Sequence, residues 1–180
     1  MTGRDVWITG IGLLTCLGED TESNVKGLSG GPARLDTTTY APYLVHPLGA
    51  VDFARQIPKK SDQRQMELWQ RIGVYAAGLA LADAGLAHDA AILSRTHLVV
   101  AAGSGERDTA VDTKILESIG EAADTELLAK EVLPTALRPT LFLAQLSNLL
   151  AGNISIVHNV TASSRTMMGE EMAGLAAFEN

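Results

Sequence analysis

The sequence predicts an α/β fold with a largely parallel sheet. Segments typical of strands alternate with segments typical of helices along the 180 residues, which is the pattern of parallel strands connected by helices. The apolar run 96–102 is bounded by Gly103 and Gly105 and is typical of a central, parallel strand covered on both faces. Near the C-terminus, a turn at 161–164, the segment 165–168 and a helical stretch from residue 169 predict a strand, a sharp elbow and a helix.

Composition indicates one domain with a sizeable core, because 46% of the residues are hydrophobic and 19% are charged. No segment approaches the roughly 18 unbroken apolar residues of a membrane span, so a soluble protein without a membrane partner is expected. The chain passes directly into Val6 without the pattern of a secretory leader, which predicts the cytoplasm. The net charge of −7, with basic residues spread along the sequence, argues against a nucleic-acid partner.

The first predicted element is a strand over residues 5–9 that ends at Gly10 and Gly12. The third glycine of a G-x-G-x-x-G motif is missing, since Thr15 stands in its place. The motif therefore gives only weak support to one alternative, a nucleotide-binding oxidoreductase. A short helix over 21–28 follows, and residues 32–60 are expected to run over the surface with at most one short strand.

The clearest helix precedes Gly85. Asp62 and Gln65 have the spacing of a capping box, and apolar and small residues then recur at helical intervals. After the strand 96–102, two further helices are predicted over 110–119 and 125–133, the second broken at Pro134. Pro139 is expected to open another helix with one apolar stripe, made of Phe142, Leu146, Leu149 and Leu150.

Three of these segments resemble, in order, segments of the β-ketoacyl-acyl-carrier-protein synthases. Residues 6–18, V-W-I-T-G-I-G-L-L-T-C-L-G, resemble the opening strand and loop of that family, usually V-x-I-T-G-x-G-x-V-T-P-L-G. Residues 76–86 are similar to its first long helix, and 148–152, N-L-L-A-G, to the segment before its nucleophile strand. The resemblance implies the thiolase-like, five-layer αβαβα fold with a mostly parallel mixed sheet, of which residues 1–180 would supply the N-terminal half.

The resemblance leaves two alignments for the position of the family's nucleophilic cysteine. In the first, 160–164, V-T-A-S-S, resembles V-T-A-C-S-S and puts Ser163 at the cysteine, but about eight residues must be deleted, including the strand that carries the elbow. In the ungapped alignment, 162–164 matches the turn G-P-S and 171–174 matches C-x-S/A-G, so Glu171 stands at the cysteine position. The ungapped alignment is favoured because it keeps the strand, elbow and helix that the chemistry needs.

With Glu171 at that position, the resemblance implies a chain that cannot hold an acyl thioester. Residues 170–175, E-E-M-A-G-L, are also similar to the chain-length factors of type II polyketide systems. We therefore expect a non-condensing, chain-length-factor-like or partner subunit of fatty acid or polyketide biosynthesis. The alternative is the N-terminal part of an active acyl-transferring ketosynthase. The implied partners are acyl carrier protein or acyl-CoA and a second subunit, in a homodimer or in a heterodimer with a ketosynthase, joined through residues 163–168.

No cofactor and no metal site is expected. Cys16 is the only cysteine, which excludes an internal disulfide and a cysteine-rich zinc site, and it is interpreted as a small packed residue. Ser163 as a nucleophile would need a base within hydrogen-bond reach, and the sequence nominates none. The four histidines match no motif of the family and are expected to be surface or capping residues: His46, His88, His97 and His158.

Overall fold

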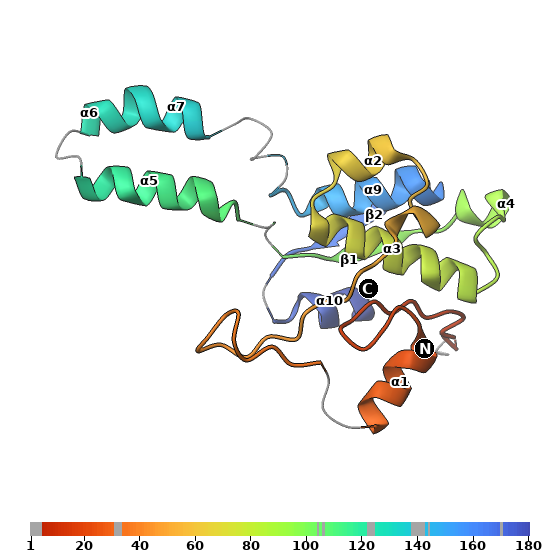
Figure 1. Cartoon of the computed structure of the whole chain (residues 1–180). Coiled ribbons are helices and arrows are strands. Elements are labelled where there is room, and N and C mark those ends of the chain that lie inside the picture. Colours follow the sequence, from red (N-terminus) through yellow and green to blue (C-terminus); the bar gives the residue numbers. More distant parts are fainter. Residues whose placement is uncertain are drawn as a thin grey trace.

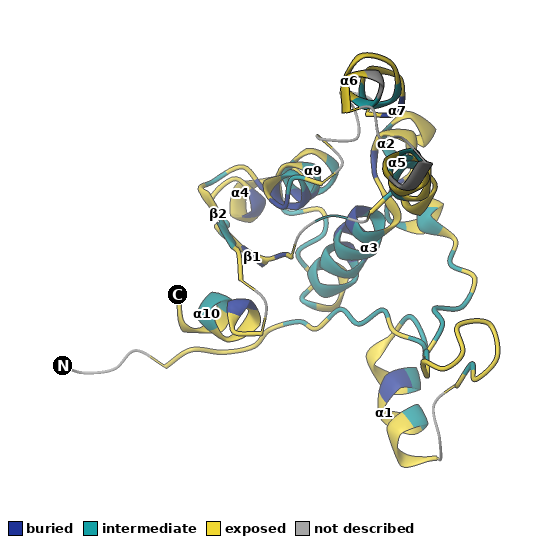
Figure 2. Cartoon of the chain, turned by 90° about the vertical axis from the view of Figure 1, so that its left-hand side faces the viewer, coloured by how far each residue is buried: buried dark blue, intermediate teal, exposed yellow. Residues whose placement is uncertain are grey.

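The computed structural model describes residues 5–30, 34–103, 105, 107–121, 125–137, 143, 145–169 and 171–180. In this part of the chain, β1 (Leu98–Ala101) and β2 (Ser164–Met167) form a two-stranded parallel sheet. The helices α3 (Leu68–Asp83) and α9 (Asn148–His158) pack together on one side of the strands, and α10 (Ala173–Glu179) contacts both strands from the other side (Figures 1 and 2). The predicted α/β fold with parallel strands is confirmed.

The core lies where α3, α9 and β1 meet. Gly73 allows α3 to approach α9 closely, since a Cβ at this position would lie 2.6 Å from Cδ1 of Leu150. Small residues in a helix thus serve helix-to-helix packing here. The buried cluster consists of Ile57, Met66, Val74, Val100, Ala102, Leu150, Ala151 and Ile154.

The apolar run 96–102 forms the predicted parallel strand, β1, with helices on both of its faces, but this strand is not central in the described part of the chain. There β1 pairs only with β2, and its side chains alternate in burial. Val100 is 8% exposed, whereas Val99 is 37% exposed. An apolar run without alternation is ambiguous, because it records how hydrophobic the segment is and not which elements of the same chain cover it.

The strand predicted over residues 5–9 does not form either. Within the described residues no strand pairs with this segment, and Val6, Trp7 and Ile8 are 93%, 80% and 68% exposed. A strand needs a neighbour that accepts and donates its backbone hydrogen bonds. Residues 5–9 have the apolar, β-rich composition of a strand. The described part of the chain offers them no strand to pair with.

The residues after this segment lie directly on α3. The backbone amide of Ile11 donates a hydrogen bond to Oδ2 of Asp83 over 2.9 Å. A Cβ at Gly10 would lie 2.4 Å from the carbonyl oxygen of Ala80, and a Cβ at Gly12 only 2.0 Å from that of Ala76. The two glycines of the incomplete motif are therefore needed for close approach to a helix backbone.

The helix predicted over 21–28 is confirmed as α1 (Thr21–Ser29), and the loop before it is fastened to α3. The carboxylate of Glu19 accepts a 2.6 Å hydrogen bond from the hydroxyl of the fully buried Tyr75 and a 2.8 Å bond from Arg55. Burial and Glu19 raise the pKa of Tyr75 to about 12, so the phenol stays protonated and keeps donating. Phe53, in the short 3-10 helix η1 (Phe53–Arg55), meets the Tyr75 ring edge-on at 5.8 Å.

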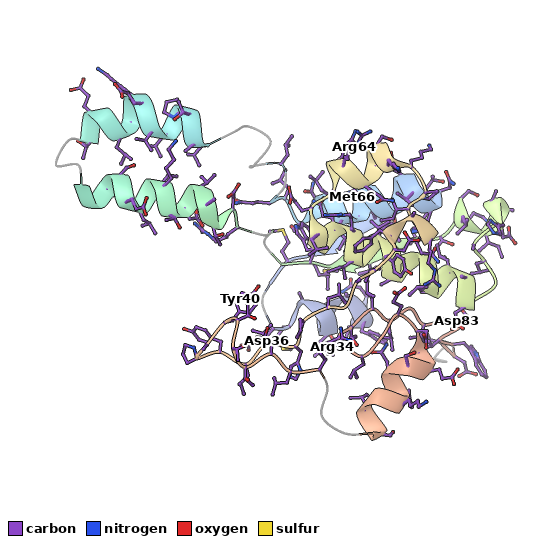
Figure 3. All side chains as sticks on the ribbon, in the orientation of Figure 1. Arg34, Asp36, Tyr40, Arg64, Met66 and Asp83 are labelled. Atoms are coloured by element: carbon purple, nitrogen blue, oxygen red, sulfur yellow. The ribbon has the colours of Figure 1, made fainter. Side chains whose placement is uncertain are left out.

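Residues 34–52 contain no helix or strand, as predicted for a surface excursion, but the excursion predicted to reach residue 60 ends at η1, and Ile57 after it is fully buried in the core. One isolated antiparallel bridge joins Asp36 to Val45. Hydrogen bonds from Thr39 and Thr38 lower the pKa of Asp36 to about 2 and close the turn between them. Figure 3 shows Asp36 and Tyr40 in this excursion, which extends away from the α3 and α9 helices.

The clearest predicted helix is present, but its start was wrong. A separate helix, α2 (Lys60–Gln65), ends just before Met66, which belongs to the buried core cluster and is 5% exposed. The capping box that opens α3 is formed by Glu67 and Gln70, because burial of Met66 interrupts the helix between the two candidate boxes. The predicted stop at Gly85 is confirmed by its positive φ of 70°. A short helix, α4 (Ala90–Leu93), follows it.

A helical hairpin projects from the rest of the chain (Figure 1). Its first arm is α5 (Thr109–Glu121), and its second arm runs through α6 (Thr125–Leu127), the π-helix η2 (Leu128–Val132) and α7 (Leu133–Ala136). The predicted break at Pro134 is wrong, because this proline is the second residue of α7, where its missing amide is tolerated. The helix start predicted at Pro139, with Phe142, lies outside the described residues. No helix in the described part is long and apolar enough to cross a membrane.

Candidate functional site

The predicted strand, elbow and helix are present around Glu171. β2 ends at Met167, Gly169 has a φ of 149°, and Met172 is the N-cap of α10. Glu171 lies in the bend between them and is exposed. No hydrogen bond or ion pair joins its carboxylate to another described residue. The elbow therefore presents a free carboxylate immediately before a helix N-terminus, where negative charge is favoured.

The helix after the elbow is anchored on one side only. Ala173 is 8% exposed and lies toward the strands, which α10 contacts. The apolar side chains of Met172, Leu175 and Phe178 are 64%, 51% and 82% exposed. Figure 2 shows α10 beneath β1 and β2, with the N-terminal segment below it in this view. The elbow thus sits on an incompletely covered surface of the chain.

Ser163 lies at the other end of β2 and has a partner that the sequence analysis missed. Its Oγ is 2.6 Å from Nδ1 of His97, and both residues are exposed. His97 directly precedes β1 just as Ser163 directly precedes β2, and the parallel register brings Leu98 opposite Ser164. This contact could have been predicted from the sequence, because residues that precede neighbouring parallel strands lie at the same edge of a sheet. An imidazole at this distance has the reach of a general base for a hydroxyl.

Ser163 and Glu171 belong to two separate places on the chain. They flank β2, whose four residues span about 13 Å at about 3.3 Å per residue. The alignment that puts Ser163 at the cysteine position requires deletion of about eight residues, including the strand that carries the elbow. The ungapped alignment retains it and puts Glu171 after its carboxyl end. In the described residues no histidine contacts the Glu171 carboxylate.

The remaining histidines and Cys16 either contact backbone groups, are exposed or are partly buried in a turn. Nε2 of His158 is 2.8 Å from the carbonyl oxygen of Val74, and Nδ1 of His46 is 3.0 Å from that of Arg34. His88 is exposed. Cys16 is partly buried in the tight turn before α1, which lies apart from α10 in Figures 1 and 2. Among the described residues no group of His, Cys, Asp and Glu is arranged to hold a metal ion.

The pKa of His158 gives a pH-dependent stability. Burial lowers this pKa below the ordinary value of 6.5, although the hydrogen bond with Val74 opposes the shift. Between the two values the unfolded chain binds a proton that the folded chain does not, so stability falls as the pH falls through 6.5 toward the folded pKa. We expect urea unfolding to show this loss between about pH 7.5 and about pH 5.5. The loss should be smaller in His158→Gln, and equal slopes in both proteins would contradict the assignment.

An apolar cavity of about 300 Å³ lies between α3, α9, the start of β1 and the end of the N-terminal segment. Glu171 and Ser163 are not in its wall. The cavity is therefore a gap in the packing beside the core and does not extend from the elbow. Its lining consists of Thr9, Gly10, Ala77, Ala80, Leu81, Ala84, Leu86, Thr96, Leu98, Ile154 and Val160.

Comparison with known proteins gives one family over nearly the whole chain. Residues 3–180 match the family model described as the N-terminal domain of beta-ketoacyl synthase. The 3-oxoacyl-(acyl-carrier-protein) synthase 2 of Vibrio cholerae serotype O1 is 28% identical over 188 aligned positions, which cover 98% of this chain and 42% of that protein. The chain thus spans less than half the length of this curated relative.

Solved structures have a similar fold. A type II PKS acyl-carrier protein in complex with its ketosynthase includes a chain with a TM-score of 0.67 and 20% identity, over 96% of this chain and 45% of that one. The ishigamide ketosynthase/chain length factor gives a TM-score of 0.59 and 22% identity, over 88% of this chain and 38% of that one. At these identities the likeness concerns the fold.

Proposed function

Because the chain belongs to the β-ketoacyl synthase family through its N-terminal domain, we propose that it is part of a ketosynthase-like protein of fatty acid or polyketide biosynthesis that does not itself condense acyl units. The observation that carries the non-condensing role is Glu171 in the elbow between β2 and α10. The ungapped alignment assigns this position to the cysteine. The only cysteine of the chain, Cys16, lies before α1.

The chemical reason is the nucleophile itself. A thiolate forms a thioester that is stable enough to carry an acyl group and reactive enough to release it, whereas an acyl group on a carboxylate forms an anhydride that water removes. A carboxylate at this position lies one residue before the N-cap Met172, close to the end of α10 where negative charge is favoured. The role that fits both points is a chain-length-factor-like or partner subunit beside an active ketosynthase, and one similar structure is such a ketosynthase/chain length factor pair.

The alternative function is that of an active acyl-transferring subunit with Ser163 as its nucleophile. Its 2.6 Å contact with His97 is the specific observation in favour, since it supplies the base that the sequence did not nominate. The glycine motif no longer supports the nucleotide-binding alternative, because close contact with α3 already explains why Gly10 and Gly12 are glycines. The family match gives no support for it.

Acylation separates the two acyl-related functions. We expect intact-protein mass spectrometry to detect no acyl adduct after the chain is incubated with acyl carrier protein loaded with an acyl group, or with acyl-CoA. Ser163→Ala and His97→Gln should then leave the spectrum unchanged. An adduct that maps to Ser163 and disappears in both variants would replace the non-condensing role with the active one.

The accessible surface supports association with a further protein surface. The chain has 12784 Å² of accessible surface, whereas a compact monomer of 19.0 kDa has about 8,400 Å². The excess is of the size that large permanent interfaces bury. Exposed apolar side chains on the N-terminal segment and on α10 contribute to it, including Trp7 and Phe178.

We propose that the edge of β2 that does not pair with β1, over residues 163–168, joins a homodimer or a heterodimer with a ketosynthase. Unpaired strand edges offer backbone groups to a second chain. Analytical ultracentrifugation at micromolar concentration should give a dimer or a larger species. A proline at Thr166 removes a backbone donor of β2, so Thr166→Pro should shift the distribution toward monomer, and a monodisperse monomer of the unmodified chain would contradict the proposal.

A further inference from the structure

Opposite charges gather on two separate parts of this chain. Residues 55–71 contain five of the 14 Lys and Arg residues and only two acids. Residues 109–131, which belong to the projecting helical hairpin, contain six of the 21 Asp and Glu residues and only two bases. The hairpin lies apart from α2 in Figure 1, so its described acids do not cover the basic residues of their own chain. The net charge of −7 therefore conceals one basic and one acidic surface.

The basic surface is an open groove of about 530 Å³ between α2 and the start of α3, which we call the α2 groove. Lys60 and Arg64 in its wall are exposed, and no described carboxylate forms an ion pair with either. They are four residues apart on α2, so their like charges face each other and destabilise the helix. An anionic surface that covers them relieves this repulsion. The lining consists of Lys60, Gln63, Arg64, Met66, Glu67 and Arg71.

The other charged groups of the α2 groove leave these two cations available. The Glu67 carboxylate accepts a hydrogen bond from the backbone in the capping box of α3. Arg71 lies over the Phe53 ring at 5.4 Å and adds a third positive charge to the wall. Figure 3 shows Arg64 at the outer side of α2, where a second molecule can reach it. The α2 groove therefore offers positive charge to a partner from outside the chain.

The hairpin presents carboxylates beside apolar side chains. Glu117 on α5 and Glu131 in η2 are exposed, and no described base forms an ion pair with either. Leu116 and Ile119 on α5 are 66% and 53% exposed, and they are three residues apart on the same face of this helix. Removing such side chains from water favours binding, and the neighbouring carboxylates select a partner of opposite charge.

We propose that the α2 groove binds the hairpin of a second copy of this chain, with Glu117 and Glu131 of one copy against Lys60 and Arg64 of the other. Charge complementarity identifies this occupant, because both surfaces of the contact are present on the one chain. Each copy offers one groove and one hairpin, so two copies can make the contact twice in a closed pair. The contact does not rest on the proposed function, and it is separate from pairing through the edge of β2.

Sedimentation velocity of the full chain tests the contact. Self-association should weaken as salt is raised, because exposed charges are screened beyond about 10 Å at 0.1 M salt. The groove variant, Lys60→Glu with Arg64→Glu, and the hairpin variant, Glu117→Lys with Glu131→Lys, each replace two attractions by two repulsions. Each should weaken self-association about tenfold or more. Pairing through the edge of β2 is the same in all of these chains, so the differences between them report the α2 groove and the hairpin.

Mixing the two variants gives the sharpest result. In the mixture, the groove of each variant meets a hairpin of opposite charge, so the two variants should associate with each other about as tightly as the unmodified chain does with itself. Misfolded chains would not recover association in this way, and circular dichroism of each variant checks its fold independently. Lys26→Glu with Arg34→Glu is the matched control, since it makes the same change of charge at exposed positions in α1 and in the surface excursion.

The control should associate like the unmodified chain. Three results overturn the proposal: association of the unmodified chain that does not change with salt, a mixture that associates no better than the separate variants, and a control that loses association as the groove variant does. Loss of association in the groove variant but not in the hairpin variant overturns it as well, because the α2 groove would then bind a different surface.

Discussion

Gly12→Ala is expected to destabilise the protein by about 3 kcal/mol or more, or to prevent it from folding. The added Cβ would lie 2.0 Å from the carbonyl oxygen of Ala76 and 2.6 Å from the backbone nitrogen of Ala80. Both atoms belong to the backbone of α3, which cannot move aside as a flexible side chain would. The N-terminal segment would have to leave α3, and its hydrogen bond from Ile11 to Asp83 would be lost with it.

Gly152→Ala is the matched control for this change. Gly152 lies within α9, and a Cβ there meets no atom within 4 Å. Alanine in a helix interior is favoured over glycine, so this variant should be about 0.5 to 1 kcal/mol more stable than the unmodified chain. Urea unfolding of the three proteins measures both effects. Unchanged stability in Gly12→Ala would show that the segment does not pack on α3 as described.

The sequence could predict those elements whose signal is local. The helix of residues 21–29 has its N-cap in Asp20, whose side chain accepts a hydrogen bond from the Ser23 amide, and Gly85 ends α3 with a positive φ. The order of strand, elbow and helix around Glu171 follows from the change of pattern between β2 and α10. In each case the interactions that set the boundary lie within a few residues of it.

Predictions were wrong where contacts between residues far apart in the sequence determine the local structure. The segment at Val6 has the composition of a strand, but pairing depends on a partner that lies elsewhere in the sequence. The capping box was placed at Asp62 because spacing alone cannot show that Met66 is drawn into the core and divides α2 from α3. The run 96–102 indicated a buried strand, yet Val99 is partly exposed because the described chain covers one face better than the other.

The candidate sites also differ in whether local or distant residues determine them. The place of Glu171 in the bend before α10 was predictable, because the change of pattern that indicates this bend is local. The contact between His97 and Ser163 joins residues 66 positions apart, and it became predictable only from the parallel pairing of β1 with β2. The groove between α2 and the start of α3 depends on the packing of these two helices, which brings Lys60 and Arg71 to one opening. Charge counted along the sequence did not reveal it.

Glu171→Cys is expected to create a reactive thiol without creating acyl transfer. Position 171 is exposed and lies one residue before the N-cap of α10, whose N-terminal end favours a thiolate. Acyl transfer also needs a base and donors for the developing oxyanion, and no described side chain offers them to this position. Iodoacetamide should therefore label the variant rapidly, while its acylation by acyl carrier protein remains at the level of the unmodified chain.

Glu179→Cys supplies the matched control, since it puts the same thiol at the exposed C-terminal end of the same helix. There the helix dipole disfavours the thiolate, and a difference of about 0.3 to 1 kcal/mol at each end predicts labelling about three- to thirtyfold slower than at position 171. Intact-protein mass spectrometry over time measures labelling and acylation together. Equal labelling rates at positions 171 and 179 would contradict the expected effect of the helix dipole on the thiolate. A stable acyl adduct at position 171 in the isolated chain would show that the elbow already holds the groups needed for transfer, and that the glutamate alone keeps it silent.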